Sequence, residues 1–491
     1  MGLGAIVFLC FAALSTLGLA LMLLSLIGLA PMKQVTAEDA VAFFHPFADG
    51  GGGGERVLWY AVKAIREMAP KAKIYIYARQ GVSAAQLLAD AQQRFSIQLE
   101  GGSSSQPIIE VVPLVNSQLL APERYPRFTL VGQSWGAARL GRQALLLLRP
   151  RVFIDTTGWA ATYPLARLAG CRVVAYTHYP TISTDMIRKV WARTQDFNND
   201  PRVAGSALRS LAKLVYYNAF ALAYGAAGAF AQLVMVNSSW TQRHVAALFW
   251  SWTPPTRVYP PCDTLRLQQL PLDRRLKQLY VVSVAQFRPE KDHQKQLRAF
   301  AAAKARAGVG RGSSLKNAGV LRGARLKLVG SCRGPADEAR LAELQALAQQ
   351  LGVAGSVDWC VNVPFSELVE LLGDAVAGLH TMRNEHFGIS VVEYMAAGAV
   401  PIAHKSGGPL EDIVVAHEEL DTGQLQPTGF LADSVQEYAD ALVEVLTMDQ
   451  RSRLDIATAA RRQAAAFSNE RFVQDFQLAM EAVLPPSCLS R

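Results

Sequence analysis

Two glutamates in the C-terminal half of the chain, Glu385 and Glu393, have residue types and a spacing that suit binding chemistry. Seven residues separate them in NEHFGISVVEYMAAGAVPIAHKSGGPLEDIV, and this pattern predicts a helix that begins near Ile389. Backbone N–H groups around 387–390 could then hold a diphosphate, because a helix N-terminus favours an anion. Glu393, about one turn into the helix, could accept two ribose hydroxyls, and Glu385 in the preceding loop could hydrogen-bond a sugar. Both could instead be ordinary acids that stabilise a helix start.

A run of five glycines, Gly50 to Gly54, is the second candidate for binding chemistry. The run stands in AVAFFHPFADGGGGGERVLWYAVKAIREM, between an apolar segment that predicts a buried strand over 40–44 and a helical pattern over 57–68. A strand, a glycine loop and a helix N-terminus together resemble the phosphate-binding turn of a nucleotide-binding βα unit. The spacing is not G-x-G-x-x-G, so a flexible surface loop is the alternative.

The elements that must position these residues form two successive rounds of strand and helix. Short apolar runs rich in Val and Ile alternate with helical stretches, which indicates parallel sheets covered by helices. The expected strands are 72–78, 127–132, 151–158, 171–178 and 231–239 in the first round, and 279–287, 325–331, 357–361, 375–381 and 399–406 in the second. The proline-rich segment WTPPTRVYPPCDT separates the rounds and is typical of a stiff linker. We therefore expect an α/β fold with two Rossmann-like domains that face a cleft.

The expected domain organisation has four parts. They are a transmembrane anchor over 1–32, a first domain over 33–262 with the glycine loop, a second domain over 263–450, and C-terminal helices over 451–491 that pack back across the domains. No charged residue occurs from Gly2 to Met32, and at about 1.5 Å per residue this apolar run is long enough to cross a bilayer. Lys33 on its C-terminal side predicts that the body of the protein is cytosolic.

A second uncharged segment, from Leu214 to Val236, is also long enough to cross a membrane. A crossing there would place the two domains on opposite sides of the bilayer and destroy the cleft between them. Its alanines and glycines, with Asn218 and Gln232, also make it less apolar than the anchor. We therefore expect a helix, either on the membrane surface or in the domain core, followed by a strand.

Composition narrows the possible partners and cofactors. The net charge of +9 and the pI of about 9.3 suit an anionic membrane face or a phosphorylated substrate. No run of Lys or Arg is interleaved with aromatic residues, so nucleic acid is not the favoured partner. The six cysteines are scattered without a C-x-x-C pair, which argues against a zinc cluster and against a disulfide framework.

Several longer stretches between about His45 and Pro409 carry a family resemblance. The E-x7-E arrangement around HFGIS resembles the retaining glycosyltransferase family 4, whose members have the two-domain GT-B fold. A closer likeness is carried by the stretches FFHPFADGGGGGERVLW, GQSWGAARLG, FIDTTGWAATYPLARLAGCRVVAYTHYPTIS, VMVNSSWT, SVAQFRPEKDH and NEHFGISVVEYMAAGAVPIAHKSGGP. In these stretches, the chain is similar to the dolichol-pathway alpha-1,2-mannosyltransferases of the endoplasmic reticulum, which belong to that family.

The resemblance implies that the second domain binds the donor, GDP-mannose. Glu385 would contact the mannose and Glu393 the ribose. Three residues would hold the diphosphate through their backbone groups: Phe387, Gly388 and Ile389. Lys291 matches the family's lysine on the diphosphate. The family usually has arginine where this chain has Gln286, so either this residue or Arg288, two positions on, would face the donor phosphates.

In the first domain, the resemblance gives a role to one histidine and to the glycine loop. His178, at the end of VVAYTH, matches the family histidine that reaches the transferred sugar, although a lone histidine at a strand end is more often structural. Four glycines would let the backbone approach the diphosphate of donor or acceptor: Gly51, Gly52, Gly53 and Gly54. The expected catalytic residues are then Glu385, His178, Lys291 and Arg288.

The resemblance implies a retaining alpha-1,2-mannosyltransferase that extends a trimannosyl, dolichol-diphosphate-linked oligosaccharide at the cytosolic face of the endoplasmic reticulum. Its partners would be GDP-mannose, the lipid-linked glycan, the membrane and other mannosyltransferases of the pathway. No D-x-D motif is placed to bind a metal in either domain, so metal dependence is not expected. Two alternatives remain: a dolichol-pathway GDP-mannose transferase of different linkage, and an inactive scaffold that recruits the true enzymes.

Overall fold

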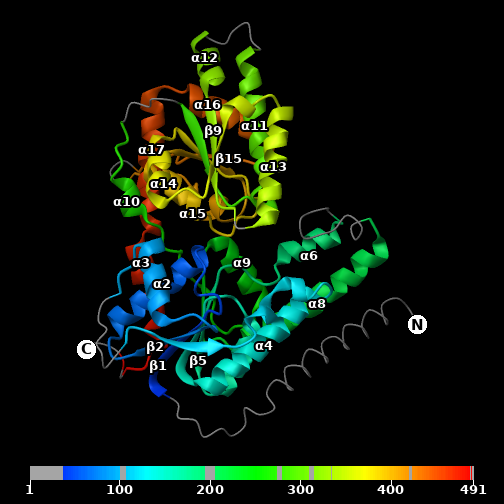
Figure 1. Cartoon of the computed structure of the whole chain (residues 1–491), viewed down its shortest axis with the longest axis vertical. Helices are drawn as coiled ribbons and strands as arrows, with labels where there is room; N and C mark the ends of the chain where they lie inside the picture. Colours follow the sequence, from blue (N-terminus) through cyan, green and yellow to red (C-terminus); the bar gives the residue numbers. More distant parts are fainter. Residues whose placement is uncertain are drawn as a thin grey trace. The chain divides into compact units, whose positions relative to one another are not determined.

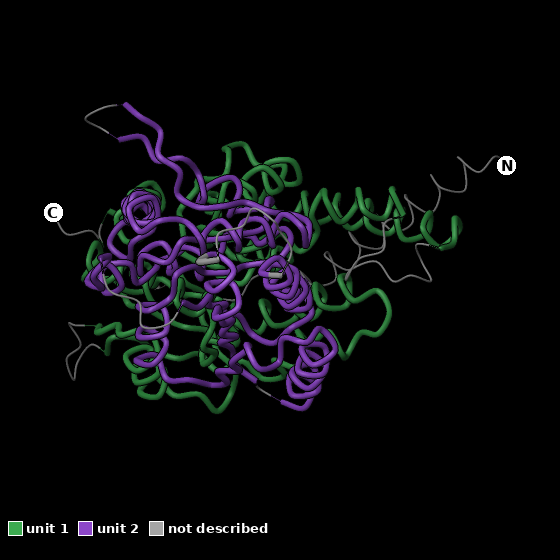
Figure 2. The backbone as a smooth tube through the Cα atoms, turned by 90° about the horizontal axis from the view of Figure 1, so that it is seen from above, with its two compact units in different colours: residues 1–259, 472–491 green, residues 260–471 purple. Residues whose placement is uncertain are grey.

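The computed structural model describes residues 37–99, 107–193, 205–273, 279–308, 315–332, 334–419, 423–486 and 488, and it divides into two compact units. Unit 1 extends to Tyr259 and takes up the chain again from Phe472, while unit 2 comprises Pro260–Arg471 (Figure 2). The expected anchor over 1–32 and Lys33 lie outside the described residues.

Unit 1 is built on a sheet of seven described strands, in the order β3-β2-β1-β4-β5-β6-β7, whose paired strands all run parallel. The strands are β1 Ala37–Phe44, β2 Lys73–Arg79, β3 Glu110–Leu114, β4 Pro150–Asp155, β5 Arg172–Thr177, β6 Leu233–Val236 and β7 Thr256–Arg257. The predictions of strands over 40–44, 72–78, 151–158, 171–178 and 231–239 are confirmed by β1, β2, β4, β5 and β6.

The predicted strand over 127–132 is wrong, because α4 begins at Thr129. Phe128 takes a left-handed conformation, with a φ of 55°, and the chain then runs as a helix to Leu147. Leu140 and Ala144, which follow the segment 127–132, are buried at helical spacing. Packing of this helical face therefore outweighs the preference of residues 127–132 for a strand. Two strands of this sheet were not predicted, β3 and the two-residue β7; β3 lies at the edge of the sheet, where its proline is tolerated.

Helices cover both faces of this sheet. The helices of unit 1 are α2 Gly53–Met68, α3 Ala84–Phe95, α4 Thr129–Leu147, α5 Tyr163–Leu168, α6 Thr184–Trp191, α8 Ala207–Gly228, α9 Ser239–Leu248 and most of α18 Asn469–Met480. Successive residues of β1 point to opposite faces. Phe43 packs in a buried cluster with residues of α2 and α18, whereas Phe44 packs in another with residues of α4, α5 and α8.

The segment Leu214–Val236 forms the predicted helix followed by a strand. Its first part continues α8, which runs over Ala207–Gly228, and its last residues are β6, which pairs with β5 in the sheet. Tyr217, Phe220 and Tyr224 of α8 are buried in the cluster that contains Phe44. Over the described ranges, no helix combines the length and the apolar character that a membrane crossing requires.

Unit 2 has a second parallel sheet, whose described strands follow the order β10-β9-β8-β11-β12-β15. The strands are β8 Tyr280–Val284, β9 Arg325–Gly330, β10 Val357–Val361, β11 Ala377–Leu379, β12 Val400–His404 and β15 Phe430–Ala432, with a small antiparallel pair, β13 His417–Glu418 and β14 Leu425–Gln426. All five strands predicted for the second round are confirmed, by β8 to β12.

The helices of unit 2 also lie on both faces of its sheet (Figure 1). They are α10 Thr264–Gln268, α11 His293–Ala305, α12 Leu315–Gly323, α13 Pro335–Gln350, α14 Phe365–Asp374, α15 Ile389–Ala397, α16 Val435–Thr447 and α17 Gln450–Ala464. Leu297 and Phe300 of α11, Leu344 of α13 and Tyr438 of α16 share one buried core with the strands.

Each sheet has one position at which the strand order reverses. It lies between β1 and β4 in unit 1, and between β8 and β11 in unit 2. In open parallel sheets, the loops that leave the carboxyl ends of two such strands separate to opposite faces and form a binding crevice. This topology predicts that the loops after β1 and β4, and those after β8 and β11, contain the functional residues of the two units.

Candidate active site

The loops after β8 and β11 of unit 2 bring together residues from two distant parts of the sequence. β8 is followed by a short turn of 3-10 helix over Pro289–Lys291, and β11 is followed by the loop that leads to α15. Nζ of Lys291 lies 2.5 Å from Oε2 of Glu385 and 3.1 Å from Sδ of Met382. Two of the charged residues predicted for the second domain are therefore in direct contact, although 94 positions separate them in the chain.

Glu385 is held by two donors on one carboxylate oxygen. Besides Lys291, Nε2 of His380 lies 3.1 Å from the same Oε2. Within the described part of the chain, no hydrogen bond is made to the other oxygen, Oε1, and 13% of the side chain is exposed. The carboxylate can therefore accept a hydrogen bond from a ligand while it keeps both protein partners.

The electrostatics keep Glu385 ionised. Burial alone would raise the pKa of this carboxyl, but the charge of Lys291 and the hydrogen bond with His380 outweigh burial and hold the pKa well below its usual range. Lys291, with 24% of its side chain exposed, has three N–H donors, of which two meet Glu385 and Met382. The pair thus presents an acceptor and a charged donor side by side.

The backbone around Lys291 is fixed by side chains that the sequence reading did not single out. The hydroxyl of Thr381 is directed at the carbonyl oxygens of Lys291, at 2.8 Å, and Asp292, at 3.1 Å. Nε2 of Gln296 donates to the same hydroxyl oxygen at 3.0 Å. These residues are buried and polar, and their role depends on contacts across about 90 positions of sequence, which no local motif reveals.

The helix N-terminus predicted next to Glu385 is present, because α15 begins at Ile389. Gly388 precedes it with a φ of 117°, a conformation that favours glycine. Phe387 is buried, and Glu393 lies partly exposed in the middle of the helix. The first backbone N–H groups of this helix have no partners within the helix itself, which is what binding of an anion at this end requires.

The second glycine turn of the motif explains how the Glu385 loop is shaped. The amide of Gly408 donates to the carbonyl oxygen of Glu385 at 2.8 Å. A Cβ on Gly407 would lie only 2.2 Å from that same oxygen, and Gly407 has a φ of 63°. Both glycines are therefore needed for the close approach of two backbone segments, which shapes the loop that contains Glu385.

The basic residue predicted beside Lys291 lies on the same turn. Arg288 is exposed and directly precedes the short helix, and its carbonyl oxygen accepts the amide of Lys291 at 3.2 Å. Gln286 lies two positions earlier and is partly exposed. Both side chains are thus on the loop that follows β8, at the carboxyl end of the sheet.

In unit 1, the glycine loop wraps around a carboxylate of its own chain. α2 begins at Gly53, and Oε2 of Glu55 accepts the amide of Gly52 at 2.6 Å. Oε1 of Glu55 lies 3.4 Å from Nε2 of His45, whose Nδ1 lies 2.8 Å from the hydroxyl of Thr156 in the loop after β4. Burial would raise the pKa of Glu55, but His45 and the Gly52 amide outweigh burial and lower it to about 2.

The glycines of this loop leave room for that carboxylate. A Cβ on Gly50 would lie 2.8 Å from the Glu55 carboxylate, and one on Gly52 would lie 3.0 Å from it. A Cβ on Gly51 would lie 2.9 Å from the guanidinium of Arg94. Glu55 is a residue that the sequence reading passed over, and the capping-box spacing from the residue before the helix was the signal that could have found it.

His178 lies next to the glycine loop, in the position predicted at the end of β5. A Cβ on Gly54 would lie 3.7 Å from Nε2 of His178, and the imidazole packs 5.0 Å from the ring of Tyr176. Unit 1 thus brings together its two predicted features, the histidine and the glycines.

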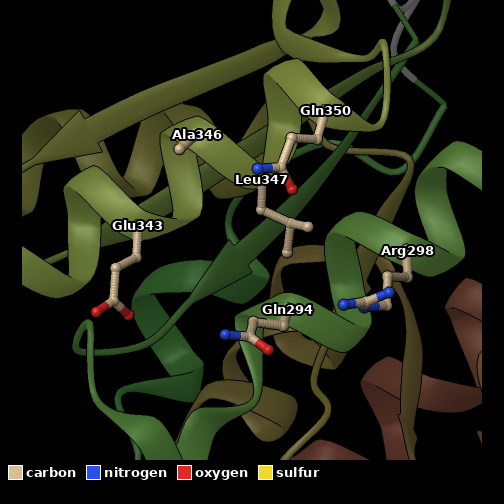
Figure 3. A pocket seen from close by; sticks show the side chains of 6 residues that line it. All are labelled: Gln294, Arg298, Glu343, Ala346, Leu347 and Gln350. Carbon is tan, nitrogen blue, oxygen red and sulfur yellow. The ribbon is translucent and has the colours of Figure 1, made fainter.

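A shallow pocket on unit 2 contains none of the predicted residues. It has a volume of about 370 Å³ and lies between α11 and α13 (Figure 3). The side chains that line it are Gln294, Arg298, Glu343, Ala346, Leu347 and Gln350. Elsewhere in the described ranges, no group of three or more His, Cys, Asp or Glu side chains is arranged to hold a metal ion.

Comparison with solved structures establishes the fold class. The chain superposes on a sucrose-phosphate synthase from Thermosynechococcus elongatus with a TM-score of 0.59 and 15% identity, over 89% of this chain and 96% of that one. It superposes on the Anabaena protein HepE in complex with UDP with a TM-score of 0.56 and 17% identity, over 90% and 100% of the two chains. With its two parallel sheets, the chain has the GT-B glycosyltransferase fold.

Comparison of sequences gives the family. Residues 38–249 match the ALG11 mannosyltransferase N-terminus, and residues 269–463 match the glycosyl transferases group 1. A mouse protein named GDP-Man:Man(3)GlcNAc(2)-PP-Dol alpha-1,2-mannosyltransferase is 44% identical over 92% of this chain and 88% of its own length. The human protein of the same name is 42% identical over 91% and 88%. The chain belongs to the family of these alpha-1,2-mannosyltransferases, whose name specifies a dolichol-linked oligosaccharide.

Proposed function

We propose that this chain transfers mannose from GDP-mannose, in alpha-1,2 linkage, to Man3GlcNAc2-PP-dolichol and so produces Man5GlcNAc2-PP-dolichol for protein N-glycosylation. The observation that carries the proposal is the Lys291–Glu385 pair beside the N-terminus of α15, in a chain 44% identical to a protein named for this reaction. A scaffold without catalytic function would not need an ionised, partly exposed acid and base held together in this way.

Glu385 contacts the mannose and Lys291 the diphosphate in this proposal. The oxygen Oε1 of Glu385 accepts a hydroxyl of the sugar, since Lys291 and His380 both lie on Oε2. The third N–H of Lys291 donates to a phosphate oxygen. Glu393 accepts the ribose hydroxyls from within α15.

The diphosphate lies at the N-terminus of α15, against backbone groups of Phe387, Gly388 and Ile389. As the bond between sugar and phosphate breaks, GDP gains negative charge and the sugar becomes oxocarbenium-like. Lys291 and the helix N-terminus are positive groups fixed before the reaction, so they stabilise the leaving group without reorganising. The exposed Arg288 adds positive charge on the same turn as Lys291. The new bond forms on the same face of the sugar, with retention of the alpha configuration, and no metal is required for this charge stabilisation.

The roles of His178 and of Gly51 to Gly54 stay predictions. His178 is proposed to reach the transferred sugar, and the glycine loop to approach the diphosphate of donor or acceptor. Gly52 already donates its amide to Glu55, so the amides of Gly53 and Gly54, at the start of α2, are the ones offered to a ligand.

The protein is proposed to act at the endoplasmic reticulum membrane, with its body on the cytosolic side. The uncharged run from Gly2 to Met32 supports a single-pass anchor, and the lipid-linked acceptor named for the relatives supports a membrane location. Other mannosyltransferases of the dolichol pathway are proposed as partners at the same membrane.

The test is transfer by the purified full-length chain, in detergent, with labelled GDP-mannose and a synthetic lipid-linked trimannosyl acceptor. UDP-glucose serves as the matched donor control, because a solved structure of the same fold contains UDP. We expect labelled glycolipid with GDP-mannose alone. Transfer from UDP-glucose instead, or none from either donor, would contradict the proposed function.

A further inference from the structure

His380 is a buried histidine that directly follows β11, and its backbone is fixed on both sides. Only 3% of the residue is exposed. Its amide donates to the carbonyl oxygen of Ile402 at 2.9 Å, and its own carbonyl oxygen accepts the hydroxyl of Tyr438 at 2.9 Å. The backbone that carries the imidazole is therefore held in place on both sides.

The hydrogen bond between His380 and Glu385 has a defined direction. Nε2 lies 3.1 Å from Oε2 of the carboxylate, and an ionised carboxylate can only accept. Nε2 must therefore carry a hydrogen and donate a hydrogen bond to Oε2 of Glu385. Nδ1 is buried and has no hydrogen-bond partner among the described residues.

That arrangement is costly to the fold, which points to a function. A buried polar atom without a partner costs about 1–3 kcal/mol, and an apolar side chain of similar size would avoid this cost. The side-chain hydrogen bond that accompanies this cost is the one from Nε2 of His380 to Glu385, the predicted catalytic glutamate. Lys291, the other partner of Glu385, is a compact charge with rotatable donors, so it attracts the carboxylate without fixing its orientation.

We propose that His380 is the positioning residue of the donor site, which holds Oε2 of Glu385 so that Oε1 is directed at the mannose of the bound donor. The proposal rests on the proposed function, in which Glu385 contacts that sugar. His380 itself does not touch the donor. It acts by selecting one orientation of the carboxylate before the donor binds, which lowers the cost of ordering it on binding.

Two substitutions separate the hydrogen bond from the packing. His380→Leu fills the space but removes the donor, whereas His380→Gln places an amide N–H close to the position of Nε2. His417→Leu, in the small β13–β14 pair of the same unit, is the matched control for loss of a histidine elsewhere. Thermal unfolding of each variant shows whether its fold is retained.

Binding of GDP and of GDP-mannose, measured by calorimetry, provides the readout that a merely structural role would not change. We expect His380→Leu to weaken GDP-mannose binding about tenfold and to leave GDP binding unchanged, because GDP lacks the sugar. We expect His380→Gln to restore most of the lost affinity. Equal weakening for both ligands, no weakening for either, or a glutamine variant as impaired as the leucine variant would overturn the proposal.

Transfer kinetics provide the second readout. We expect His380→Leu to lower kcat about tenfold to a hundredfold, since a small misplacement of a positioning group can cost that much. An unchanged kcat would overturn the positioning role. If the wild-type protein binds GDP-mannose but transfers nothing, the proposed function fails, and the comparison of GDP with GDP-mannose still decides the role of His380.

Discussion

Replacement of Lys291 by methionine is the perturbation that most directly tests the proposed charge stabilisation at the candidate donor site. Methionine keeps the length of the side chain and removes the ammonium group. In the structure, that group lies 2.5 Å from Oε2 of Glu385, and the two side chains are 24% and 13% exposed. At an effective dielectric of about 20, two unit charges 4 Å apart attract each other by about 4 kcal/mol.

The same ammonium group is proposed to meet the diphosphate as it gains charge. Loss of one fixed donor to such a group costs about 3–4 kcal/mol of transition-state stabilisation in enzymes. Each 1.36 kcal/mol is a factor of ten in rate, so we expect Lys291→Met to lower kcat/KM by at least about a hundredfold. Glu385→Ala should have an effect of the same size.

The assay is transfer from GDP-mannose to the lipid-linked acceptor, with fold integrity checked by circular dichroism and thermal unfolding. Arg306→Met is the matched control, because it breaks an exposed ion pair with Asp440 on the same unit, which should contribute less than about 1 kcal/mol. We expect normal kcat/KM for that control. Near-normal turnover by a folded Lys291→Met protein would refute the assignment of the unit 2 site.

The pH dependence of transfer by the Lys291→Met variant provides a second test, in which the direction of the shift is predicted. In the wild type, burial would raise the pKa of Glu385, but the charge of Lys291 helps to hold it well below its ordinary value. Glu385 is therefore ionised at all pH values near and above that ordinary value. Without Lys291 its pKa must rise, so we expect the acid limb of the activity profile to move to higher pH. An acid limb at the wild-type position would show that Lys291 does not control this carboxyl.

Three further predictions follow from single contacts. Glu393→Ala should raise the KM for GDP-mannose and leave kcat nearly unchanged, because ribose contacts differ little between ground and transition states; a fall in kcat alone would contradict this role. Glu55→Gln should destabilise the protein at pH 7 by up to about 3 kcal/mol in urea unfolding, since the pKa of Glu55 falls from 4.5 to about 2 on folding. This contribution is present above pH 4.5 and is lost as the pH falls through about 2, so an effect independent of pH would contradict it. Gly407→Ala should lower activity and thermal stability, because its Cβ would lie 2.2 Å from the carbonyl oxygen of Glu385, whereas Gly423→Ala, with a similar φ of 67° and no neighbour within 4 Å, should be the milder change.

Much of the sheet architecture could be predicted because buried parallel strands have continuous apolar sequences. The runs at β2, β4, β5 and β8 to β12 were all read correctly. The prediction for the segment 127–132 was wrong because a few β-favouring residues stand at the start of a helix. The helical spacing of buried residues is visible only over α4 as a whole. β3 and β7 were missed because one is a short edge strand with a proline and the other has two residues inside a proline-rich segment.

Only part of the candidate donor site could likewise be predicted from the sequence. The start of α15 at Ile389 was readable from the local pattern around Glu385. The contact of Glu385 with Lys291 was not, because it depends on β8 and β11 being neighbours at the point where the strand order reverses. The role of His380 could not be predicted either, because it depends on the hydrogen bond with Glu385, which no local motif shows.

The measurement that tests the proposed function most directly is the linkage and number of the mannoses added to the lipid-linked trimannosyl acceptor. Purified wild-type protein and the Glu385→Ala variant are each supplied with GDP-mannose, and the released glycans are weighed by mass spectrometry before and after digestion with an alpha-1,2-specific mannosidase. We expect a wild-type product two mannoses heavier than the acceptor, with both mannoses removed by the mannosidase, and almost no product from the variant. A product that resists the enzyme, or a variant as active as the wild type, would contradict the proposed function.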